Sequence, residues 1–285
     1  MNQHPNIFSV DLEDWYQGIE IDMDDWAQFT PRIRKGLDPL LALLEETNTK
    51  ATFFVLGYQA EKTPELIRQI SDQGHDIASH GYSHRFVYQQ TPSEFQTELR
   101  RSKTVLEDIC GQAVIGYRAP FFSITQQSLW AFDILLEEGF QYDSSLFPVK
   151  NYRYGIEGAD RQAGWITTPD GNKLYEIPLS TVRLPRPGMQ LAKNVPMSGG
   201  GYFRLYPYAL TKFLINRLHA ENQGLVFYMH PWEYDPHHPK IDFPRKFPKF
   251  THYLNLHSCF DKTRKLLNDF EFTTIKEAYS RHYAG

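Results

Sequence analysis

The spacing of apolar residues changes repeatedly along the chain, so that short strand-like runs alternate with stretches that have a helical period. Strand-like runs are expected at residues 7–14, 51–57, 75–80, 114–120, 140–145 and 225–233. Helical patterns are expected at residues 36–46, 63–74, 91–111, 123–139 and 206–224. This alternating order is typical of a parallel sheet or barrel, whose strands end on a common face.

The signals at helix ends agree with these boundaries. The stretch 36–46 carries leucines at Leu37, Leu40, Leu41 and Leu44, which form one face of a helix and predict a core position for it. Residues 91–94, "TPSE", have the form of a capping box and predict the start of a further helix.

The middle of the chain follows a different pattern. The helical period fades after Pro148, and residues 165–179 predict a hairpin around a Pro-Asp-Gly-Asn turn. Residues 259–278 predict a closing helix followed by a strand. We therefore expect one domain over residues 1–285, with an insertion at about 148–200 and a C-terminal extension at about 235–285.

Composition supports a large folded core and excludes two classes of partner. Hydrophobic residues make up 41% of the 285 residues, with 20 Phe, 17 Tyr and 5 Trp, which is ample apolar material. The net charge of −4 gives no general attraction to nucleic acid or to an anionic membrane surface. A neutral or small partner is expected, and the sequence leaves the oligomeric state open.

Targeting and redox signals point to a cytoplasmic protein. The first 16 residues lack the basic region and apolar run of a secretory signal, and no apolar run is long enough to span a bilayer. Cys110 and Cys259 are far apart and form no C-x-x-C motif, which argues against a disulfide framework and a thiolate metal site.

Polar residues fall where the predicted strands end, which is where parallel α/β barrels build their active sites. They are Asp11, Glu13 and Asp14 after the first strand, His80 and His84 after the third, and then Arg118, Asp143 and His230. The two histidines of "HGYSH" are four residues apart, a spacing that can close on one zinc ion. A carboxylate and two histidines would leave one coordination position open, as in catalytic zinc sites.

Five motifs in order, "DLED", "SHGYSH", "YRAPF", "YDSS" and "YMHPWE", resemble those of the NodB-type polysaccharide deacetylases, the fourth carbohydrate esterase family. The segments "MHPWEYD" and "FPKFTHYLNLHS" resemble in particular the exosortase-associated branch, found with exopolysaccharide gene clusters. The resemblance spans nearly the whole chain and implies a distorted (β/α) barrel of about seven parallel strands. It implies one bound divalent metal ion, most often zinc, with cobalt or nickel as possible substitutes.

The resemblance also assigns a role to each motif residue. His80 and His84 would bind the metal, and Asp11 would be the general base, oriented by Arg118. The remaining roles are His230 as general acid, Asp143 as the residue that tunes it, and the backbone N–H of Phe121, after Pro120, as an oxyanion donor.

The carboxylate ligand is open between two residues. The family usually has adjacent aspartates, base then ligand, whereas this chain has Asp11-Leu12-Glu13-Asp14. Strand alternation puts Glu13 on the same face as Asp11 and favours it. If the strand ends at Glu13, Asp14 can turn inward; we give Asp14 the preference because aspartate is the family's usual ligand.

The expected function is therefore metal-dependent removal of N-acetyl groups from an N-acetylated sugar, glycan or polysaccharide precursor. The alternatives are an allantoinase-like hydrolase of cyclic amides and a non-catalytic glycan-binding protein. Binding alone would need neither Asp11 nor His230. A metalloprotease is disfavoured because "HGYSH" lacks the glutamate of H-E-x-x-H, and a two-carboxylate glycosidase would leave the histidines unexplained.

Overall fold

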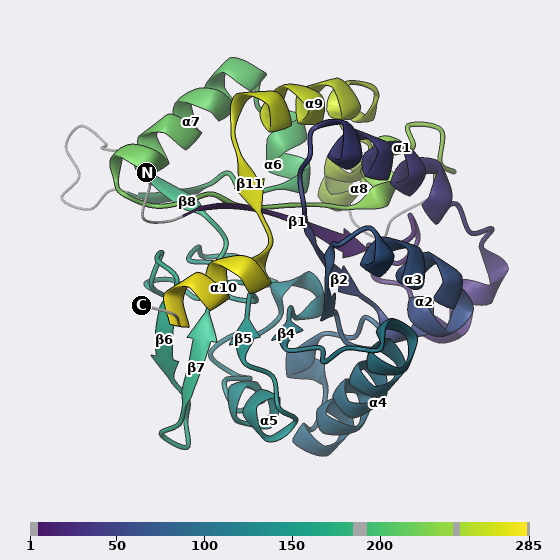
Figure 1. Ribbon diagram of the computed structural model, residues 1–285, viewed down its shortest axis with the longest axis vertical. Helices are drawn as coiled ribbons and strands as arrows, with labels where there is room; N and C mark the ends of the chain where they lie inside the picture. The colour runs from purple at the N-terminus through teal and green to yellow at the C-terminus, as the bar shows by residue number, and fades with distance from the viewer. Residues whose placement is uncertain (1–4, 185–192, 242–245, 284–285) are drawn as a thin grey trace.

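The computed structural model describes residues 5–184, 193–241 and 246–283. Its centre is a curled sheet in which neighbouring strands run β10-β1-β2-β3-β4-β5-β7 in parallel (Figure 1). The strands of this sheet are β1 (Asn6–Leu12), β2 (Thr52–Val55), β3 (Asp76–Ser79), β4 (Gly116–Tyr117), β5 (Tyr142–Asp143), β7 (Lys173–Glu176) and β10 (Val226–Met229). This is the curled parallel sheet of a (β/α) barrel, as the alternating pattern predicted.

Four further strands complete the sheets. The short strand β11 (Phe272–Thr273) pairs with the first residues of β1, and β6 (Gly164–Thr167) pairs with β7 in antiparallel register. The predicted hairpin is thereby confirmed, and its second strand joins the main sheet beside β5. A separate two-stranded sheet consists of β8 (Thr181–Leu184) and β9 (Lys193–Pro196).

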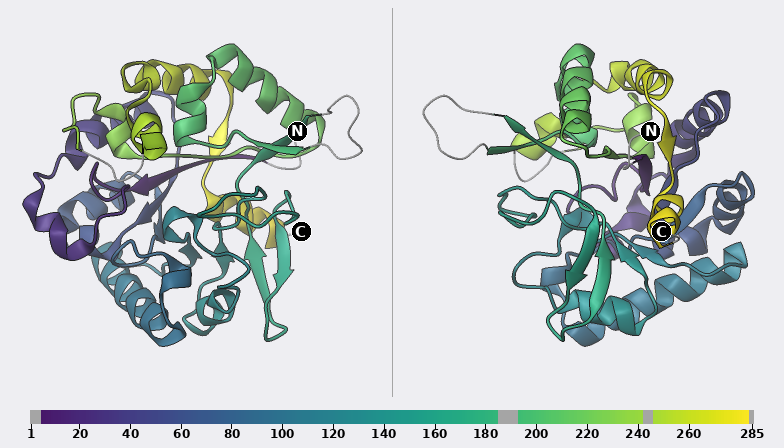
Figure 2. Two further views of the ribbon diagram at one scale, coloured as in Figure 1. Left: turned by 180° about the vertical axis from the view of Figure 1, so that it is seen from behind. Right: turned by 60° about the vertical axis from the view of Figure 1, so that its left-hand side comes forward.

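Helices flank the sheet, with α1 to α4 along one side of β1 to β4 (Figures 1 and 2). The α-helices are α1 (Ile33–Glu46), α2 (Gly57–Lys62), α3 (Pro64–Asp72), α4 (Pro92–Cys110), α5 (Ala131–Glu137), α6 (Gly200–Leu205), α7 (Tyr208–Ala220), α8 (Lys246–Tyr253), α9 (Cys259–Asp269) and α10 (Ile275–Tyr283). Short 3₁₀ turns are η1 (Met23–Gln28), η2 (Val87–Gln89), η3 (Pro120–Phe122), η4 (Pro231–Tyr234) and η5 (Leu256–Ser258).

The helix expected at residues 123–139 is shorter than its sequence pattern indicated. It begins only at Ala131, because the preceding residues form turns held by serine side chains. The hydroxyl of Ser128 accepts a hydrogen bond from the backbone N–H of Thr125 at 3.0 Å, which competes with helical bonding. The expected capping box at Thr91 and Glu94 is present at the start of α4.

The first strand is held firmly in the core, which fixes the side chains that leave its C-terminal end. Phe8 and Val10 are fully buried and belong to the same apolar cluster as Leu37 and Leu40 of α1. Burying each such side chain contributes about 1.5–3 kcal/mol. Strand β1 therefore has little freedom to move relative to the neighbouring strands and helix α1.

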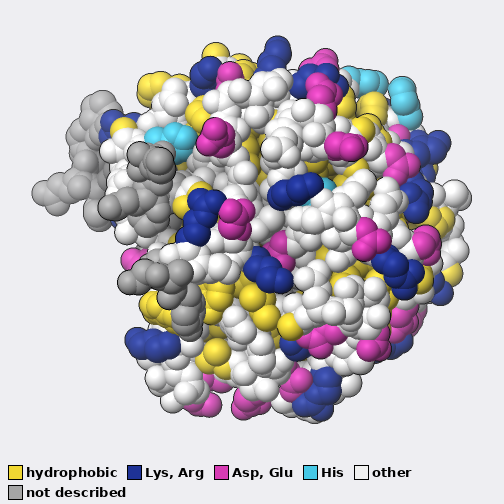
Figure 3. All heavy atoms as spheres, in the orientation of Figure 1, with side chains coloured by type: hydrophobic (Ala, Val, Ile, Leu, Met, Phe, Trp, Pro, Cys, Tyr) yellow, Lys and Arg dark blue, Asp and Glu magenta, His cyan; other side chains and the backbone are white. Residues whose placement is uncertain are grey.

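The surface carries both signs of charge. On the face in Figure 3, lysine and arginine side chains lie interspersed with aspartate and glutamate. Within the described residues, no helix combines the length and apolar character needed to cross a membrane. Cys259 is buried and Cys110 partly buried, and both are free thiols.

Candidate active site

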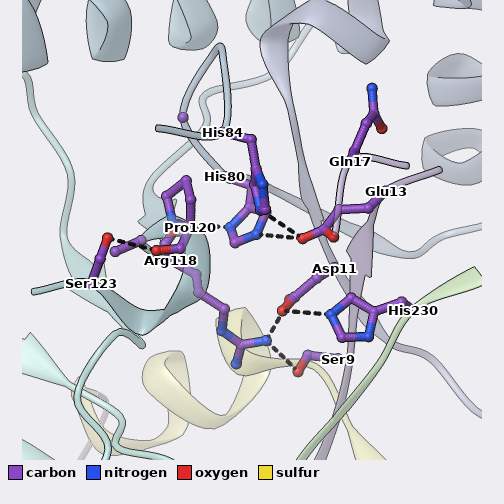
Figure 4. Close-up of polar contacts among 12 residues, drawn as sticks. Ser9, Asp11, Glu13, Gln17, His80, His84, Arg118, Pro120, Ser123 and His230 are labelled. Atoms are coloured by element: carbon purple, nitrogen blue, oxygen red, sulfur yellow. Dashed lines mark hydrogen bonds and ion pairs between the residues drawn. The ribbon is translucent and has the colours of Figure 1, made fainter. Parts of the chain in front are cut away.

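The first strand presents three polar side chains to one side of the sheet. Ser9, Asp11 and Glu13 are two residues apart, so the pleat directs them to the same face, and all three are buried. Asp11 lies beside Phe54 of β2 in parallel register, and Glu13 follows directly after the end of β1. Figure 4 shows Glu13 pointing toward His80 and His84, whereas Asp11 and Ser9 point toward Arg118.

Glu13, His80 and His84 come together as one buried cluster. Oε1 of Glu13 lies 3.1 Å from Nε2 of His80 and 2.9 Å from Nε2 of His84. The three candidate ligand atoms lie within 4.8 Å of one another. Sequence positions far apart in the chain are thus joined into the carboxylate and two-histidine set that catalytic zinc sites use.

The protonation pattern of this cluster suits a cation. Nδ1 of His80 lies 2.8 Å from the carbonyl oxygen of Arg118, which can only accept, so the neutral ring keeps the lone pair on Nε2. Oε2 of Glu13 and Nε2 of His84 have no aligned hydrogen-bond partner among the described residues. Burial lowers the pKa of His84, which favours the neutral, metal-binding form of its imidazole. The residues present therefore fit a divalent cation.

Asp14 does not join this cluster, which corrects the preference for it as the metal ligand. Its carboxylate accepts hydrogen bonds from the backbone N–H groups of Trp15, Arg32 and Ile33, at 2.7–3.1 Å. Asp14 therefore satisfies free donors at the start of α1. The alternation argument, which favoured Glu13, agrees with this geometry, because the strand pattern continues one residue past β1.

Asp11 is held by Arg118, a contact that the family resemblance implied. Nη1 of Arg118 donates to Oδ1 of Asp11 at 2.7 Å and to the hydroxyl of Ser9 at 2.9 Å. Nε and Nη2 of the same guanidinium donate to the carbonyl oxygen and the hydroxyl of Ser144. Because Arg118 is fully buried and bonded on both edges, it fixes the orientation of the Asp11 carboxylate.

His230 faces Asp11 from the end of β10. Its Nε2 lies 4.0 Å from Oδ2 of Asp11, and its Nδ1 lies 2.8 Å from Oε1 of Glu233 (Figure 4 shows the first contact). Burial alone would lower the pKa of His230, but the negative charges of Glu13, Glu233 and Asp11 raise it to about 9. These charges favour the protonated imidazole, which is the form that a proton donor requires.

The expected partnership between Asp143 and His230 is wrong. The Asp143 carboxylate accepts hydrogen bonds from the hydroxyl and the backbone N–H of Ser145, at 2.6 and 2.9 Å. It also interacts with Glu176. Burial and the negative charge of Asp143 raise the pKa of Glu176 well above its usual range. Asp143 thus caps a turn and joins a buried carboxyl pair, while Glu233 takes the place beside His230.

Two site residues were missed by the sequence reasoning. Glu233 follows His230 by three residues with a proline between them, which is the spacing of a capping box and could have suggested the contact. Glu233 is in turn bonded to the buried Arg204, with Nε to Oε2 at 2.5 Å. Ser9 could have been found because it continues the alternation of Asp11 and Glu13 toward the N-terminus.

These side chains surround a pocket of about 150 Å³. Its lining includes Asp11, Glu13, His80, His84, Phe121 and His230. His84, Phe121 and Phe122 have positive φ angles of 58°, 54° and 53°, which non-glycine residues rarely adopt. Such strain clusters at functional sites. Pro120 opens the turn that places Phe121 at the pocket.

Two family models match separate parts of the chain. Residues 22–135 match the model described as "Polysaccharide deacetylase", and residues 144–280 match one described as "Domain of unknown function (DUF3473)". The first segment contains His80, His84 and Arg118. Residues 22–135 are therefore similar to polysaccharide deacetylases, over less than half of the chain. Asp11 and Glu13 precede this match, and His230 lies in the second segment.

Curated relatives of the polysaccharide deacetylase segment carry related names. A peptidoglycan deacetylase of Helicobacter pylori is 33% identical over 178 residues, which cover 58% of this chain and 59% of the relative. A chitooligosaccharide deacetylase of a Bradyrhizobium strain is 31% identical over 97 residues, which cover 34% of this chain and 42% of the relative. The chain thus spans less than two thirds of the length of these relatives.

Solved structures share the fold over nearly the whole chain. A Pseudomonas aeruginosa structure named "probable polysaccharide deacetylase" has a TM-score of 0.62 at 16% identity and covers 99% of this chain and 91% of its own. The PuuE allantoinase structure has a TM-score of 0.61 at 16% identity and covers 99% of this chain and 90% of its own. At these identities the likeness establishes the (β/α) fold alone.

Proposed function

We propose that this protein hydrolyses the acetamide group of an N-acetylated glycan or glycan precursor and releases acetate and a free amine. The observation that carries the proposal is the meeting of two sets of groups in one pocket. One is the cluster of Glu13, His80 and His84, and the other is the facing pair of Asp11 and His230. Amide hydrolysis requires a polarised carbonyl, an activated water and a protonated leaving nitrogen, and these groups can serve all three needs.

Glu13, His80 and His84 would hold one divalent cation, most often zinc, with cobalt or nickel as substitutes. When bound, the cation would supply a Lewis acid that polarises the acetamide carbonyl and acidifies water. Nδ1 of His80 stays bonded to the Arg118 carbonyl, which keeps Nε2 directed at the cluster. The backbone N–H of Phe121 is proposed as a second donor to the developing oxyanion.

Asp11 and His230 would divide the proton transfers. Asp11 would accept the proton of the attacking water on Oδ2, and Arg118, which donates to Oδ1, keeps the carboxylate oriented. His230 donates a proton to the nitrogen as the C–N bond breaks, because an amine leaves poorly without one. Glu233 holds His230 by its Nδ1, so that Nε2 faces the pocket.

The substrate class remains a proposal drawn from relatives and from the sequence motifs. The names of the relatives point to N-acetylated glycans, while the motifs after His230 favour a role with exopolysaccharide. We propose that the substrate is a polysaccharide or its precursor. A cytoplasmic site of action, expected from the cysteine usage, is part of this proposal. Neither the cyclic-amide hydrolase nor the glycan-binding alternative is favoured by the relatives' names.

Acetate release tests the proposal directly. The purified protein is incubated with a panel of N-acetylated sugars, oligosaccharides and polysaccharides, with and without a chelator, and acetate is measured. We expect release from at least one glycan, abolished by the chelator and restored by added zinc. Allantoin serves as the comparison substrate. Ring opening of allantoin without acetate release from any glycan would contradict the proposal.

A further inference from the structure

Arg153 lies on the wall of the same pocket, outside the groups used above. It comes from the part of the chain after β5, which the polysaccharide deacetylase match at residues 22–135 does not cover. Its guanidinium lies 4.8 Å from the centre of the Phe121 ring. The His84 ring lies 4.3 Å from the same Phe121 ring, so one aromatic side chain contacts both the cation cluster and Arg153.

The backbone holds Arg153 in place. The loop that carries it is closed by a hydrogen bond from the N–H of Ile156 to the carbonyl of Phe147 at 3.0 Å. The N–H of Arg153 itself donates to the side chain of Asn151 at 3.0 Å. Gly155 has a φ of 89°, and a Cβ there would lie 2.4 Å from a backbone oxygen, so the close turn requires glycine.

The charge of Arg153 is only partly used within the protein. Nη1 pairs with Glu20 at 3.1 Å, whereas Nε has no hydrogen-bond partner among the described residues. The Glu20 side chain is 44% exposed, and an ion pair with so exposed a partner contributes little to stability, because solvent screens it. A ligand anion can therefore replace Glu20 at low cost. Cζ of the guanidinium also lies 5.6 Å from the centre of the Phe86 ring, so its aromatic neighbours leave part of its hydrogen-bonding capacity unused.

We propose that Arg153 selects substrates that carry an oxyanion, either a carboxylate or a phosphoryl group, on or next to the N-acetylated sugar. This inference rests on the proposed deacetylation. A guanidinium is charged at every physiological pH, and its planar fork matches the oxygens of carboxylates and phosphates. Neutral sugar hydroxyls would not need a fixed cation at the pocket wall. Glu20 would occupy the guanidinium while no substrate is bound.

The test compares acetate release from three matched substrate arms. These are a neutral N-acetylglucosamine oligosaccharide, an oligosaccharide with an N-acetylated uronic or muramic acid, and a phosphorylated N-acetylglucosamine. We expect the wild-type protein to prefer one anionic arm, through a lower KM. Arg153→Gln should lose roughly tenfold in kcat/KM on that arm and little on the neutral one. The preferred arm distinguishes a carboxylate from a phosphoryl group.

Two further variants separate charge recognition from a loss of structure. Glu20→Gln removes the internal competitor and should lower KM for the anionic arm, the opposite of Arg153→Gln. Arg217→Gln removes one positive charge from α7, where Arg217 is half exposed, and should leave the preference unchanged. Two results would overturn the inference while leaving deacetylation intact. One is an equal fall of kcat/KM in Arg153→Gln on the neutral and anionic substrates, and the other is a wild-type protein that does not prefer either anionic substrate.

Equilibrium binding makes the inference independent of turnover. Calorimetric titration of wild type and Arg153→Gln with the same acidic N-acetylated sugars measures affinity directly. Binding by the wild type that weakens about tenfold in Arg153→Gln supports the inference, even if no acetate were released and the proposed function failed. Equal affinity in both proteins would overturn it.

Discussion

Nδ1 of His230 lies 2.8 Å from Oε1 of Glu233, a residue only three positions further along the chain. The same carboxylate binds Arg204 through its other oxygen. The group that supports His230 is thus supplied by the turn η4 rather than by another strand of the sheet. This arrangement makes Glu233 the residue through which the protonation of His230 can be tested.

Replacement of Glu233 should shift the pH dependence of turnover. Burial lowers the pKa of His230, while the negative charges of Glu13, Glu233 and Asp11 raise it, so activity should fall as the pH rises through the pKa of this imidazole. A divalent cation bound to Glu13 would offset the contribution of that carboxylate, which leaves Glu233 and Asp11 to hold the proton. Glu233→Gln removes one of the charges that raise the pKa, and the alkaline limb of kcat/KM should move about one unit to lower pH. The pH–rate profile measures this shift. Asp143→Asn is the matched control, because Asp143 bonds Ser145 and should leave the position of the limb unchanged.

Removal of either histidine should empty the cation site. His80→Ala and His84→Ala each delete one of three ligands, and metal content should fall from about one divalent ion per chain to nearly none. Elemental analysis of the purified variants measures the content. His75→Ala is a suitable control because His75 is buried beside Phe53, away from the cluster. Full occupancy in both ligand variants would exclude this cluster as the cation site.

Replacement of the two acidic residues after β1, Glu13 and Asp14, should affect different properties, zinc affinity for the first and stability for the second. Glu13→Gln should weaken zinc binding by at least tenfold, because it removes the charged ligand, while the fold is kept. Asp14→Ala should keep zinc affinity but lower the free energy of unfolding by about 2 kcal/mol, because N–H groups at the start of α1 lose their acceptor. Zinc titration and denaturant unfolding measure the two effects. Loss of zinc from Asp14→Ala with retention in Glu13→Gln would reverse the assignment.

Replacement of Asp11 should lower turnover and leave cation binding unchanged. Asp11→Asn keeps the shape of the side chain and its contact with Arg118 but removes the proposed base. We expect kcat to fall by about 10²–10⁴ with metal content unchanged, as for the loss of a general base. Rate and metal content are measured on the same preparation. An empty site in Asp11→Asn would make Asp11 a ligand instead.

The sequence predicted the fold because each element carried its own local signal. The leucines of residues 37–44 are buried in α1, and the turn at residues 169–172 joins β6 to β7. The short strands β4 and β5 were predicted too long, since their ends continue as extended loops with the same apolar content. Their lengths are set by the hydrogen bonds of neighbouring strands, which a single segment does not encode.

The site was predicted less completely, for two physical reasons. Glu13 and Asp14 differ by one position, and the family's preference for aspartate was given more weight than the strand alternation that places Glu13 beside His80. The resemblance placed the partner of His230 on another strand, at Asp143, whereas Glu233, three residues along the chain, lies beside it. Contacts made across the pocket, such as that of Arg153 with Phe121, depend on how a loop folds back and leave no periodic signal.

Because Ser9, Asp11 and Glu13 all leave one face of β1, a slip of that strand by a single residue would turn all three away from the pocket together. The cluster with His80 and His84 forms only when β1, β2 and β3 are paired in the native register. Cation binding therefore requires the native alignment of the central strands, and a measurement of binding tests that alignment. A bound ion would in turn resist their separation, so that loss of metal and loosening of the sheet should occur as one event on heating.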